Sequence, residues 1–483
     1  MKREASLFEA IIPILFLIVI LSLNVTFFED TLAGPNQIAL ILAAAVAGLI
    51  ALRLGHHWET VRAKVVSTIG SAMPSILILL LIGSLAGTWM ISGVVPAMIY
   101  YGLTIVNPKL FLVTAVLVGS IVSVATGSSW STIATIGVAL LGIGKALGMS
   151  EAVVAGAIIS GAYFGDKMSP LSDTTNLAPA MAGTDLFTYI KYMAYTTIPT
   201  YTLTLIIFLI IGLRYDFAGA VINIEAVQGA IDGTFNTNPL LFLVPLLLFA
   251  IIILKVPPIP SLIVGTLLGG IFGIIFQPEI IKTISGVADN YAKAAYISLM
   301  QSMFGDISLS TSDPKITELL STSGMRGMLD TIWLILSAMV FGGIMESAGL
   351  LRRITQPIIK YAKSTGSLVT STVVTCLFFN TTASDQYLAI VVPGRMFRKS
   401  YQDKDLAPEL LSRTLEDSGT VTSVLIPWNT CGATQSRVLG VDTWVYAPYA
   451  FFNIISPFMT ILMAYLNIKI RRIELSGNGN SDI

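Results

Sequence analysis

Stretches of about 20 mostly apolar residues recur along almost the whole chain, separated by short polar segments. A helix needs about 20 such residues to cross the hydrocarbon core of a bilayer. The first apolar run is too long for a signal-peptide core and lacks a small-residue cleavage pattern, so it is interpreted as a transmembrane helix. The pattern predicts an all-α polytopic membrane protein with single crossings at 7–28, 36–54, 75–101, 151–183, 186–213, 238–254, 258–276, 331–350, 406–440 and 442–468.

Two further apolar stretches, 110–146 and 367–398, do not fit a single crossing. Each exceeds 30 residues and is interrupted centrally by small polar residues, TGSSWST at 126–132 and NTTASDQ at 380–386. Such a stretch suits two half-depth arms that meet at a polar tip, a re-entrant hairpin. A pair of ordinary short helices is the alternative.

The stretch FGDKMSPLSDTTN, residues 164–176, places two carboxylates, a lysine and several hydroxyls inside a predicted crossing. We expect Gly165 and Pro170 to interrupt the helix there, which frees backbone groups at a depth where lipid offers no partner. Ionisable groups inside a bilayer are costly and usually functional. The stretch therefore predicts a broken helix at an ion or substrate site, with a polar surface loop as the alternative.

An internal repeat relates the two halves of the chain. An offset of 255 positions pairs Gly87 with Gly342, Met90 with Met345, Ser92 with Ser347, Thr126 with Thr381, and Ser129 with Ser384. With small gaps, Asp166 falls opposite Asp417 and Asp185 opposite Asp442. Each half holds five spans, an odd number, so the second copy is predicted to be inverted in the membrane, as in many secondary transporters.

The repeat divides the chain into a first transmembrane repeat at 1–216, a connection at 217–237, a second repeat at 238–472 and a tail at 473–483. The first repeat holds the hairpin 110–146 and the broken helix 151–183. The second holds the hairpin 367–398 and the broken helix 406–440. Its segment 278–330 has an amphipathic character and is predicted to lie along the extracytoplasmic membrane surface.

Loop charge predicts the orientation, because cytoplasmic loops carry an excess of lysine and arginine. Basic residues gather on one side, at Lys2 and Arg3, 53–64, 352–363, 395–404 and 469–472. Glu29, Asp30 and the connection 216–232 fall on the other. Both termini are therefore predicted to be cytoplasmic.

Composition agrees with a membrane protein and excludes several classes of function. Hydrophobic residues make up 54% of the chain and charged residues 12%, against about 25% charged in soluble domains. The net charge is zero, so no nucleic-acid partner is expected. His56 and His57 lie side by side in a basic loop rather than at metal-ligand spacing. The chain contains no P-loop, dinucleotide-binding or HExxH motif, and the glycines of GSLAGTWMISG are interpreted as helix-packing residues.

The hairpin tips and helix breaks of both halves are predicted to meet near mid-bilayer. Hard cations such as Na+ prefer oxygen ligands, which these segments supply. The predicted sodium and proton site consists of Asp166, Asp173, Asp417, Asp385, Thr174, Asn176, Ser128, Ser129, Ser169 and Asn429. Asp166 and Asp173 are the principal pair.

Carboxylates in a buried site with like-charged neighbours can titrate in the physiological range. If sodium and protons compete for the same carboxylates, alternating access alone produces an antiporter. An ion pair between Asp166 and Lys167 is the structural alternative. Glu346 is interpreted either as a site member or as a surface group, and Asp185 and Asp442 as helix N-caps.

The segments ATGSSWSTIATIGVALLGIG (125–144), GAIISGAYFGDKMSPLSDTTNLAPAMAGTDLFTYIKYM (156–193) and GTVTSVLIPWNTCGA (419–433) resemble the NhaC family of bacterial sodium/proton antiporters. The resemblance implies electrochemically driven exchange of external protons for internal sodium across the bacterial plasma membrane. It also implies inverted repeats with re-entrant hairpins, and a homodimer. Sodium is then the cargo, and neither a resident cofactor nor an enzymatic activity is expected.

Some relatives exchange sodium and an organic acid such as lactate for malate and protons. An organic acid would require a cationic or amide-rich pocket, and Lys167 is the only cation in the predicted site, so a bare cation is favoured. A passive channel fits paired broken helices less well. An intramembrane protease using Asp166 and Asp417 would not need so many surrounding hydroxyl and amide groups.

Overall fold

The computed structural model describes residues 3–28, 31, 33–215, 224–309, 314–360 and 363–473. Lys2, Glu29, Asp30, the first part of the connection and nearly all of the tail, on which the sequence predictions also rest, lie outside these ranges. Within them, eight helices are long and apolar enough to cross a membrane, and ten if each of two bent helix pairs forms one span. The described chain is therefore that of a polytopic helical membrane protein.

The helices before residue 216 are α1 (Leu7–Phe27), α2 (Pro35–Arg53), α3 (Trp58–Ile91), α4 (Val94–Ile105), α5 (Phe111–Thr126), α6 (Ser129–Thr132), the π-helix η2 (Ile133–Gly137), α7 (Val138–Ala146), α8 (Glu151–Met168), α9 (Asp173–Ala182) and α10 (Leu186–Arg214). A short 3-10 turn, η1 (Pro108–Leu110), precedes α5.

The elements after residue 223 begin with α11 (Ile224–Thr234), η3 (Pro239–Phe242), α12 (Leu243–Ile253), α13 (Pro258–Phe276), α14 (Pro278–Ser285), α15 (Tyr291–Phe304), β1 (Ile307–Ser308), α16 (Pro314–Leu319), β2 (Ser321–Thr322) and η4 (Arg326–Met328). They continue with α17 (Leu329–Ser347), α18 (Leu350–Lys360), α19 (Thr365–Thr382), α20 (Gln386–Gln402), α21 (Pro408–Leu415), the π-helix η5 (Glu416–Thr420), α22 (Val421–Ser423), α23 (Thr430–Leu439), α24 (Thr443–Tyr446), η6 (Ala447–Tyr449) and α25 (Phe451–Tyr465). The two strands pair antiparallel, Ile307 with Thr322 and Ser308 with Ser321.

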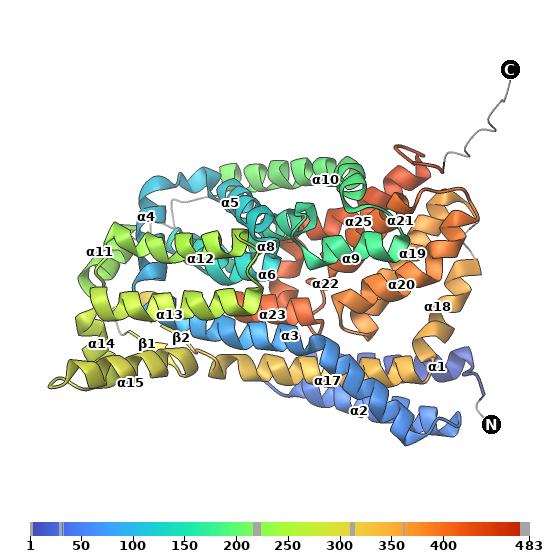
Figure 1. The fold of residues 1–483 in the computed structure, drawn as a ribbon, viewed down its shortest axis with the longest axis horizontal. Helices are drawn as coiled ribbons and strands as arrows, with labels where there is room; N and C mark the ends of the chain where they lie inside the picture. Colours follow the sequence, from blue (N-terminus) through green and yellow to red (C-terminus); the bar gives the residue numbers. More distant parts are fainter. Residues whose placement is uncertain are drawn as a thin grey trace, which may run out of the picture.

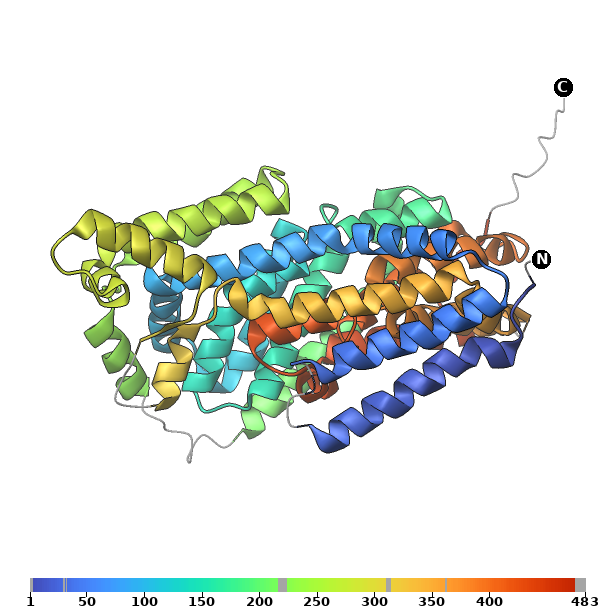
Figure 2. The ribbon, with the colours of Figure 1, turned by 90° about the horizontal axis from the view of Figure 1, so that it is seen from below.

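Two long helices, α3 and α17, join the two halves of the chain. They pack along each other, and each also packs against a helix from the opposite half, α3 against α13 and α17 against α2 (Figures 1 and 2). Gly87 of α3 lies against the backbone of Ser302 in α15, and Gly83 lies against the backbone of Gly324. These contacts agree with the predicted role of these glycines in helix packing.

Each of the two anomalous apolar stretches forms two helical arms joined by a polar tip. In the first, Gly127 at the tip has a φ of 70°, and Gly144 near the end of α7 lies against the ring of Phe111 at the start of α5. In the second, α19 and α20 pack together and the hydroxyls of Thr372 and Tyr401 are 3.2 Å apart. In both stretches the two arms therefore lie against each other, and their re-entrant depth stays a prediction. The arms of the first, 108–126 and 129–146, are each long enough to cross a membrane, so the alternative of ordinary helices stays open there.

The stretch 151–183 is a broken helix, as predicted. α8 ends at Met168 and α9 begins at Asp173, with Ser172 as the N-cap that accepts a bond from the amide of Thr175. The predicted role of Gly165 was wrong, because it lies inside α8 and allows close approach to Ser120 and Ser123 of α5. Pro170 does lie in the break, where its ring cannot donate a backbone hydrogen bond.

The stretch 406–440 is broken in the same way, since α22 ends at Ser423 and α23 begins at Thr430. Each helix that follows a break packs against the hairpin of the opposite half, α9 against α20 and α23 against η2. Figure 1 shows α23 near the centre of the molecule, with α9 and α20 beside each other toward the end where both termini lie. The breaks and the hairpin tips are thereby brought into one region.

Two predicted segments differ from the structure. The stretch 75–101 is not one span, because α3 already begins at Trp58 and Gly93, with a φ of 80°, separates it from α4. The apolar criterion missed the charged first turns of α3, which are still helical. The stretch 442–468 bends by 56° between η6 and α25. The segment 278–330 contains α14, α15, α16, η4 and a small β-hairpin, and α15 buries small residues while Tyr296 and Phe304 are exposed. Its position along the membrane surface stays a prediction.

Candidate ion-binding site

A cavity of about 440 Å³ lies between the tip of the first hairpin and the break that follows α8. The tip residues 126–128 form one wall, and Asp166, Pro170 and Asp173 form another. The loop 255–258 between α12 and α13, the first residues of α20, Gln386 and Tyr387, and Ser75 and Ile78 of α3 also line it. The cavity therefore receives side chains from both halves of the chain.

Asp166 is fixed through one carboxylate oxygen, while the other is buried without a hydrogen-bond partner in the described part of the chain. Its Oδ2 accepts hydrogen bonds from the amide of Ser129 at 3.0 Å and from the Ser129 hydroxyl at 2.6 Å. The amide is available because Ser129 is the first residue of α6, and amides in a first helical turn have no partner inside the helix. The other oxygen, Oδ1, has no hydrogen-bond partner among the described residues, and Asp166 is only 7% exposed. The structure thus brings Asp166 and Ser129 together, with Ser128 as the N-cap of α6 beside them.

Asp173, the first residue of α9, lines the same cavity and is exposed to it. Its Oδ1 accepts a bond from the amide of Thr174 at 2.9 Å. Its Oδ2 accepts a bond from the hydroxyl of Tyr387 on α20. Tyr387 was absent from the predicted site, and the only sequence signal for it is that it directly follows the polar tip NTTASDQ.

Asp417 does not line the cavity wall formed by Asp166 and Asp173. It forms an ion pair with Lys167, and both side chains are fully buried. The Asp417 carboxylate also accepts bonds from the hydroxyls of Ser456 and Thr196, each at 3.0 Å. The alternative pair of Asp166 and Lys167 is therefore not formed, because the lysine is neutralised from the second half of the chain.

The remaining predicted residues lie at the tips and breaks, where their hydrogen bonds go mainly to the backbone. Asp385 caps α20 through the amide of Leu388 at 3.0 Å, and Asn429 caps α23 through the amide of Cys431 at 3.0 Å. Ser169 donates to the carbonyl of Val124 at 2.8 Å, which joins the break to the first hairpin. Asn176 donates to the carbonyls of Pro170 and Ser172, at 2.9 and 2.6 Å. Their role as ion ligands stays a prediction.

Thr174 makes a different contact, because its hydroxyl donates to Oε1 of Glu416 at 3.2 Å. Glu416 lies in η5, is fully buried, and has no partner for Oε2 among the described residues. The first broken helix is thus hydrogen-bonded to the π-helical turn of the second half.

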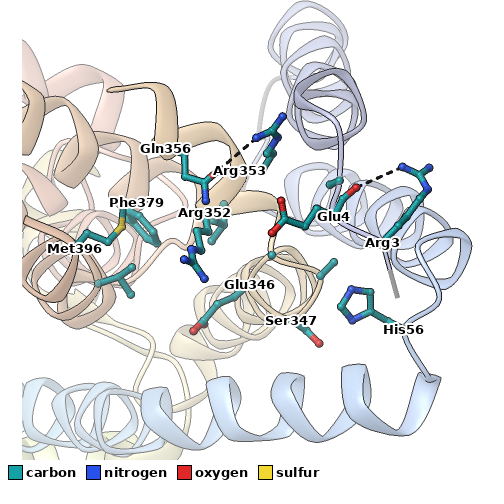
Figure 3. A pocket seen from close by; sticks show the side chains of 15 residues that line it. Arg3, Glu4, His56, Glu346, Ser347, Arg352, Arg353, Gln356, Phe379 and Met396 are labelled. Atoms are coloured by element: carbon teal, nitrogen blue, oxygen red, sulfur yellow. Dashed lines mark hydrogen bonds between the residues drawn. The ribbon is translucent and has the colours of Figure 1, made fainter. Parts of the chain in front are cut away.

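Another cavity, of about 520 Å³, lies away from this site and is shown in Figure 3. Arg3, Glu4, His56, Arg352 and Glu346 are among its lining residues. Glu346 forms an ion pair with Lys64 at 2.8 Å, with both side chains partly exposed. Of the two interpretations of Glu346, the structure therefore favours the surface group. Asp185 is an N-cap as predicted, and the Thr188 amide at 2.9 Å holds the pKa of that carboxyl below its usual range.

Within the described ranges, no three or more His, Cys, Asp or Glu side chains gather closely enough to hold a metal ion. A cation in the cavity would therefore take its ligands from two carboxylates together with hydroxyl and carbonyl oxygens. Such a mixed oxygen set suits a hard cation that binds and leaves.

The comparison with known proteins agrees with this chemistry. The model of the Na+/H+ antiporter family matches residues 161–468. The Na(+)/H(+) antiporter NhaC of Alkalihalophilus pseudofirmus is 39% identical over 91% of both chains. The Malate-2H(+)/Na(+)-lactate antiporter of Bacillus subtilis is 34% identical over 96% of this chain and 95% of its own, and the Na(+)/H(+) antiporter NhaC of the same organism is 34% identical over 89% and 92%. A family match over more than half of the chain, with relatives this similar along nearly their whole length, means that the chain belongs to the Na+/H+ antiporter family.

Proposed function

We propose that this chain exports sodium from a bacterial cell in exchange for protons, driven by the electrochemical gradient across the inner membrane. The observation that carries the proposal is the Asp166 carboxylate in the cavity lining, which has one oxygen fixed by Ser129 and one buried oxygen without a hydrogen-bond partner among the described residues. Relatives named as Na(+)/H(+) antiporters support the same exchange.

The ion site of this proposal is the wall that holds Asp166 and Asp173, with Ser128 and Thr126 at the hairpin tip beside it. A sodium ion there would bind Oδ1 of Asp166, which has no hydrogen-bond partner among the described residues, together with hydroxyl and backbone oxygens. Protons would bind the same carboxylates in the absence of sodium. Because one pocket serves both ions, exposing it alternately to the two sides of the membrane gives exchange without a second site.

The arrangement of the helices supports inverted repeats. Val116 and Ser120 of α5 lie against Gly161 and Gly165 of α8, so these two helices are parallel. Met181 and Gly183 lie against Gly394 and Arg398, so the chain after the first break runs parallel to α20, the returning arm of the second hairpin. If the chain keeps its direction across the break, the first hairpin runs opposite to the second, as an inverted repeat requires.

The orientation belongs to the same proposal. Both ends of the described chain lie at one end of the molecule (Figure 1), in agreement with two cytoplasmic termini. Accessibility of single cysteines placed at Arg3 and Ile473 tests this, and labelling from opposite sides of the membrane would contradict it. A homodimer stays an expectation from the family resemblance.

A second candidate is coupled exchange of sodium and an organic acid. The cavity volume of about 440 Å³ exceeds what a bare ion needs, and Lys255 lines it and could pair with a carboxylate substrate. One relative of this chain is named for malate and lactate exchange. Lys255 is the single cation in the described lining, against two aspartates, so we place this candidate second.

Purified protein in liposomes tests the proposal. An imposed sodium gradient is expected to move protons in the opposite direction with no organic acid present. Asp166→Asn and Asp173→Asn are each expected to abolish this flux, because each removes a negative charge that both ions need. The matched control is Asp185→Asn at the N-cap of α10, where asparagine caps equally well.

Proton flux that appears only after malate or lactate is added would select the second candidate. Unchanged exchange in both site variants would remove these aspartates from the ion site.

A further inference from the structure

We infer that Tyr387 is a positioning residue of the ion site: its hydroxyl holds the Asp173 carboxylate against the cavity wall and so ties ion binding to the contact between the second hairpin and the first broken helix. The inference rests on the proposed function and adds to it a residue that was absent from the predicted site. Tyr387 and Asp173 come from opposite halves of the chain and both line the cavity.

The geometry fixes the Asp173 carboxylate from two sides. The Thr174 amide occupies Oδ1 from within α9, and the Tyr387 hydroxyl occupies Oδ2 from α20. A phenol on a carboxylate forms a charge-assisted hydrogen bond, which is stronger and more directional than a neutral one. Since Asp173 is otherwise exposed, loss of this bond would let its side chain turn away from Asp166.

The tyrosine itself has a rigid support. It is the second residue of α20, whose first turn is capped by Asp385 through the amide of Leu388. Directly before it, the carbonyl of Ser384 accepts a bond from the amide of Thr430 at 3.0 Å, which fixes the hairpin tip to the start of α23. The position of the Tyr387 hydroxyl beside Asp173 therefore depends on the position of the second hairpin.

This arrangement couples occupancy to conformation. A sodium ion that binds between Asp166 and Asp173 would attract the same carboxylate that accepts the Tyr387 hydroxyl. Sodium binding therefore changes the strength of the hydrogen bond between Tyr387 and Asp173. Movement of the second hairpin away from α9 would release Asp173 and lower sodium affinity. Such a link is what alternating access requires of a binding site that opens toward one side at a time.

The test is Tyr387→Phe in the full-length protein, which removes one oxygen atom and keeps the ring. We expect the KM for sodium in liposomes to rise about tenfold, the size expected for a lost hydrogen bond to a charged group, with kcat changed less than about twofold. The matched control is Tyr101→Phe on α4, whose hydroxyl donates to the carbonyl of Thr237 at 3.0 Å, away from the cavity. That variant is expected to keep the wild-type KM.

Sodium-induced thermal shifts of detergent-purified protein separate positioning from a general structural effect, because they give the affinity without transport. Tyr387→Phe is expected to need about tenfold more sodium for the same shift and to keep the wild-type unfolding midpoint in the absence of sodium. A KM within about twofold of wild type, or an equal loss of stability with and without sodium, would overturn the inference.

Sodium/proton exchange and the role of Tyr387 are refuted by different results. Absence of sodium-driven proton flux in the wild-type protein would refute the proposed function. A wild-type flux with an unaffected Tyr387→Phe variant would refute the role of Tyr387 alone.

Discussion

At the scale of single residues, Lys167 and Asp417 form the only ion pair among the described residues in which both side chains are fully buried. Both side chains are fully buried, and the carboxylate also accepts bonds from Ser456 and Thr196. Transfer of two charges out of water is costly, and mutual attraction compensates for it only with good geometry and further hydrogen bonds. Either charge alone at this place would therefore be strongly destabilising.

Asp417→Asn is accordingly expected to cost about 3–5 kcal/mol of stability, because it leaves the Lys167 ammonium buried and unpaired. The measurement is the thermal unfolding midpoint in detergent. Asp185→Asn serves as the control, since that aspartate is exposed and asparagine caps a helix equally well, so the midpoint should change little.

The double variant Lys167→Met with Asp417→Leu should recover much of the lost stability, since it removes both buried charges. An Asp417→Asn protein as stable as wild type would show that the ion pair contributes nothing to folding.

Which residues share the cavity could be predicted only in part. Asp166, Asp173 and Ser128 are in the cavity lining as foreseen, because one short stretch and one hairpin tip hold them. Tyr387 and Lys255 could not be predicted, since a tyrosine after a polar tip and a lysine in a loop have no distinctive pattern. Lys167 was predicted as the cation of the site, but its partner from the second half, Asp417, neutralises it.

At the scale of helices, close packing depends on where a glycine lies on its helix. α3 contains Gly87, against the backbone of Ser302, and Gly70, which has no atom near the position of an added methyl group. The same substitution can therefore have opposite effects at two places in one helix. The difference lies in the neighbouring helix α15 and not in the local sequence.

Gly87→Ala is expected to destabilise the protein by about 1–3 kcal/mol, because the new methyl group overlaps backbone that cannot rotate away. Gly70→Ala on the same helix is the matched control and should be neutral or slightly stabilising, since alanine favours a helix over glycine. Thermal unfolding in detergent compares the two variants. Equal midpoints would mean that α15 moves without cost.

The element boundaries show what hydropathy captures and what it misses. Long apolar helices such as α1, α2 and α13 lie within a few residues of their predicted bounds. α3 begins 17 residues before its predicted start. Charged residues end an apolar run but do not end a helix that continues outside the lipid. The bend before α25 was missed although Pro448 lies in η6, two residues before Ala450, whose φ is −77° and ψ is 65°.

At the scale of the whole molecule, the two halves are interlocked. α2 packs on α17 and α13 on α3, and each helix after a break packs on the hairpin of the other half. Figure 2 shows α1, α2, α17 and α3 side by side along one face. Neither half could complete the cavity alone, because Tyr387 and Lys255 reach it from the second.

Competition between sodium and protons is the property of the whole molecule that follows from one shared pocket. The apparent dissociation constant for sodium is expected to rise about tenfold for each pH unit below the pKa of the shared carboxylates, if one proton competes, and about a hundredfold if two do. Calorimetric titration of the purified protein across the neutral range measures it. A sodium affinity that does not change with pH would contradict a shared site.

The sequence by itself determined that the chain is a polytopic helical membrane protein and that the helices at 151–183 and 406–440 are broken, because bilayer thickness and backbone hydrogen bonding leave few arrangements for such patterns. Only the tertiary structure decided which charges meet. Asp417 is held by Lys167, while Asp173 is held by Tyr387, and both contacts join residues more than 200 positions apart. Local pattern cannot specify such pairs, since they depend on how the two halves pack against each other.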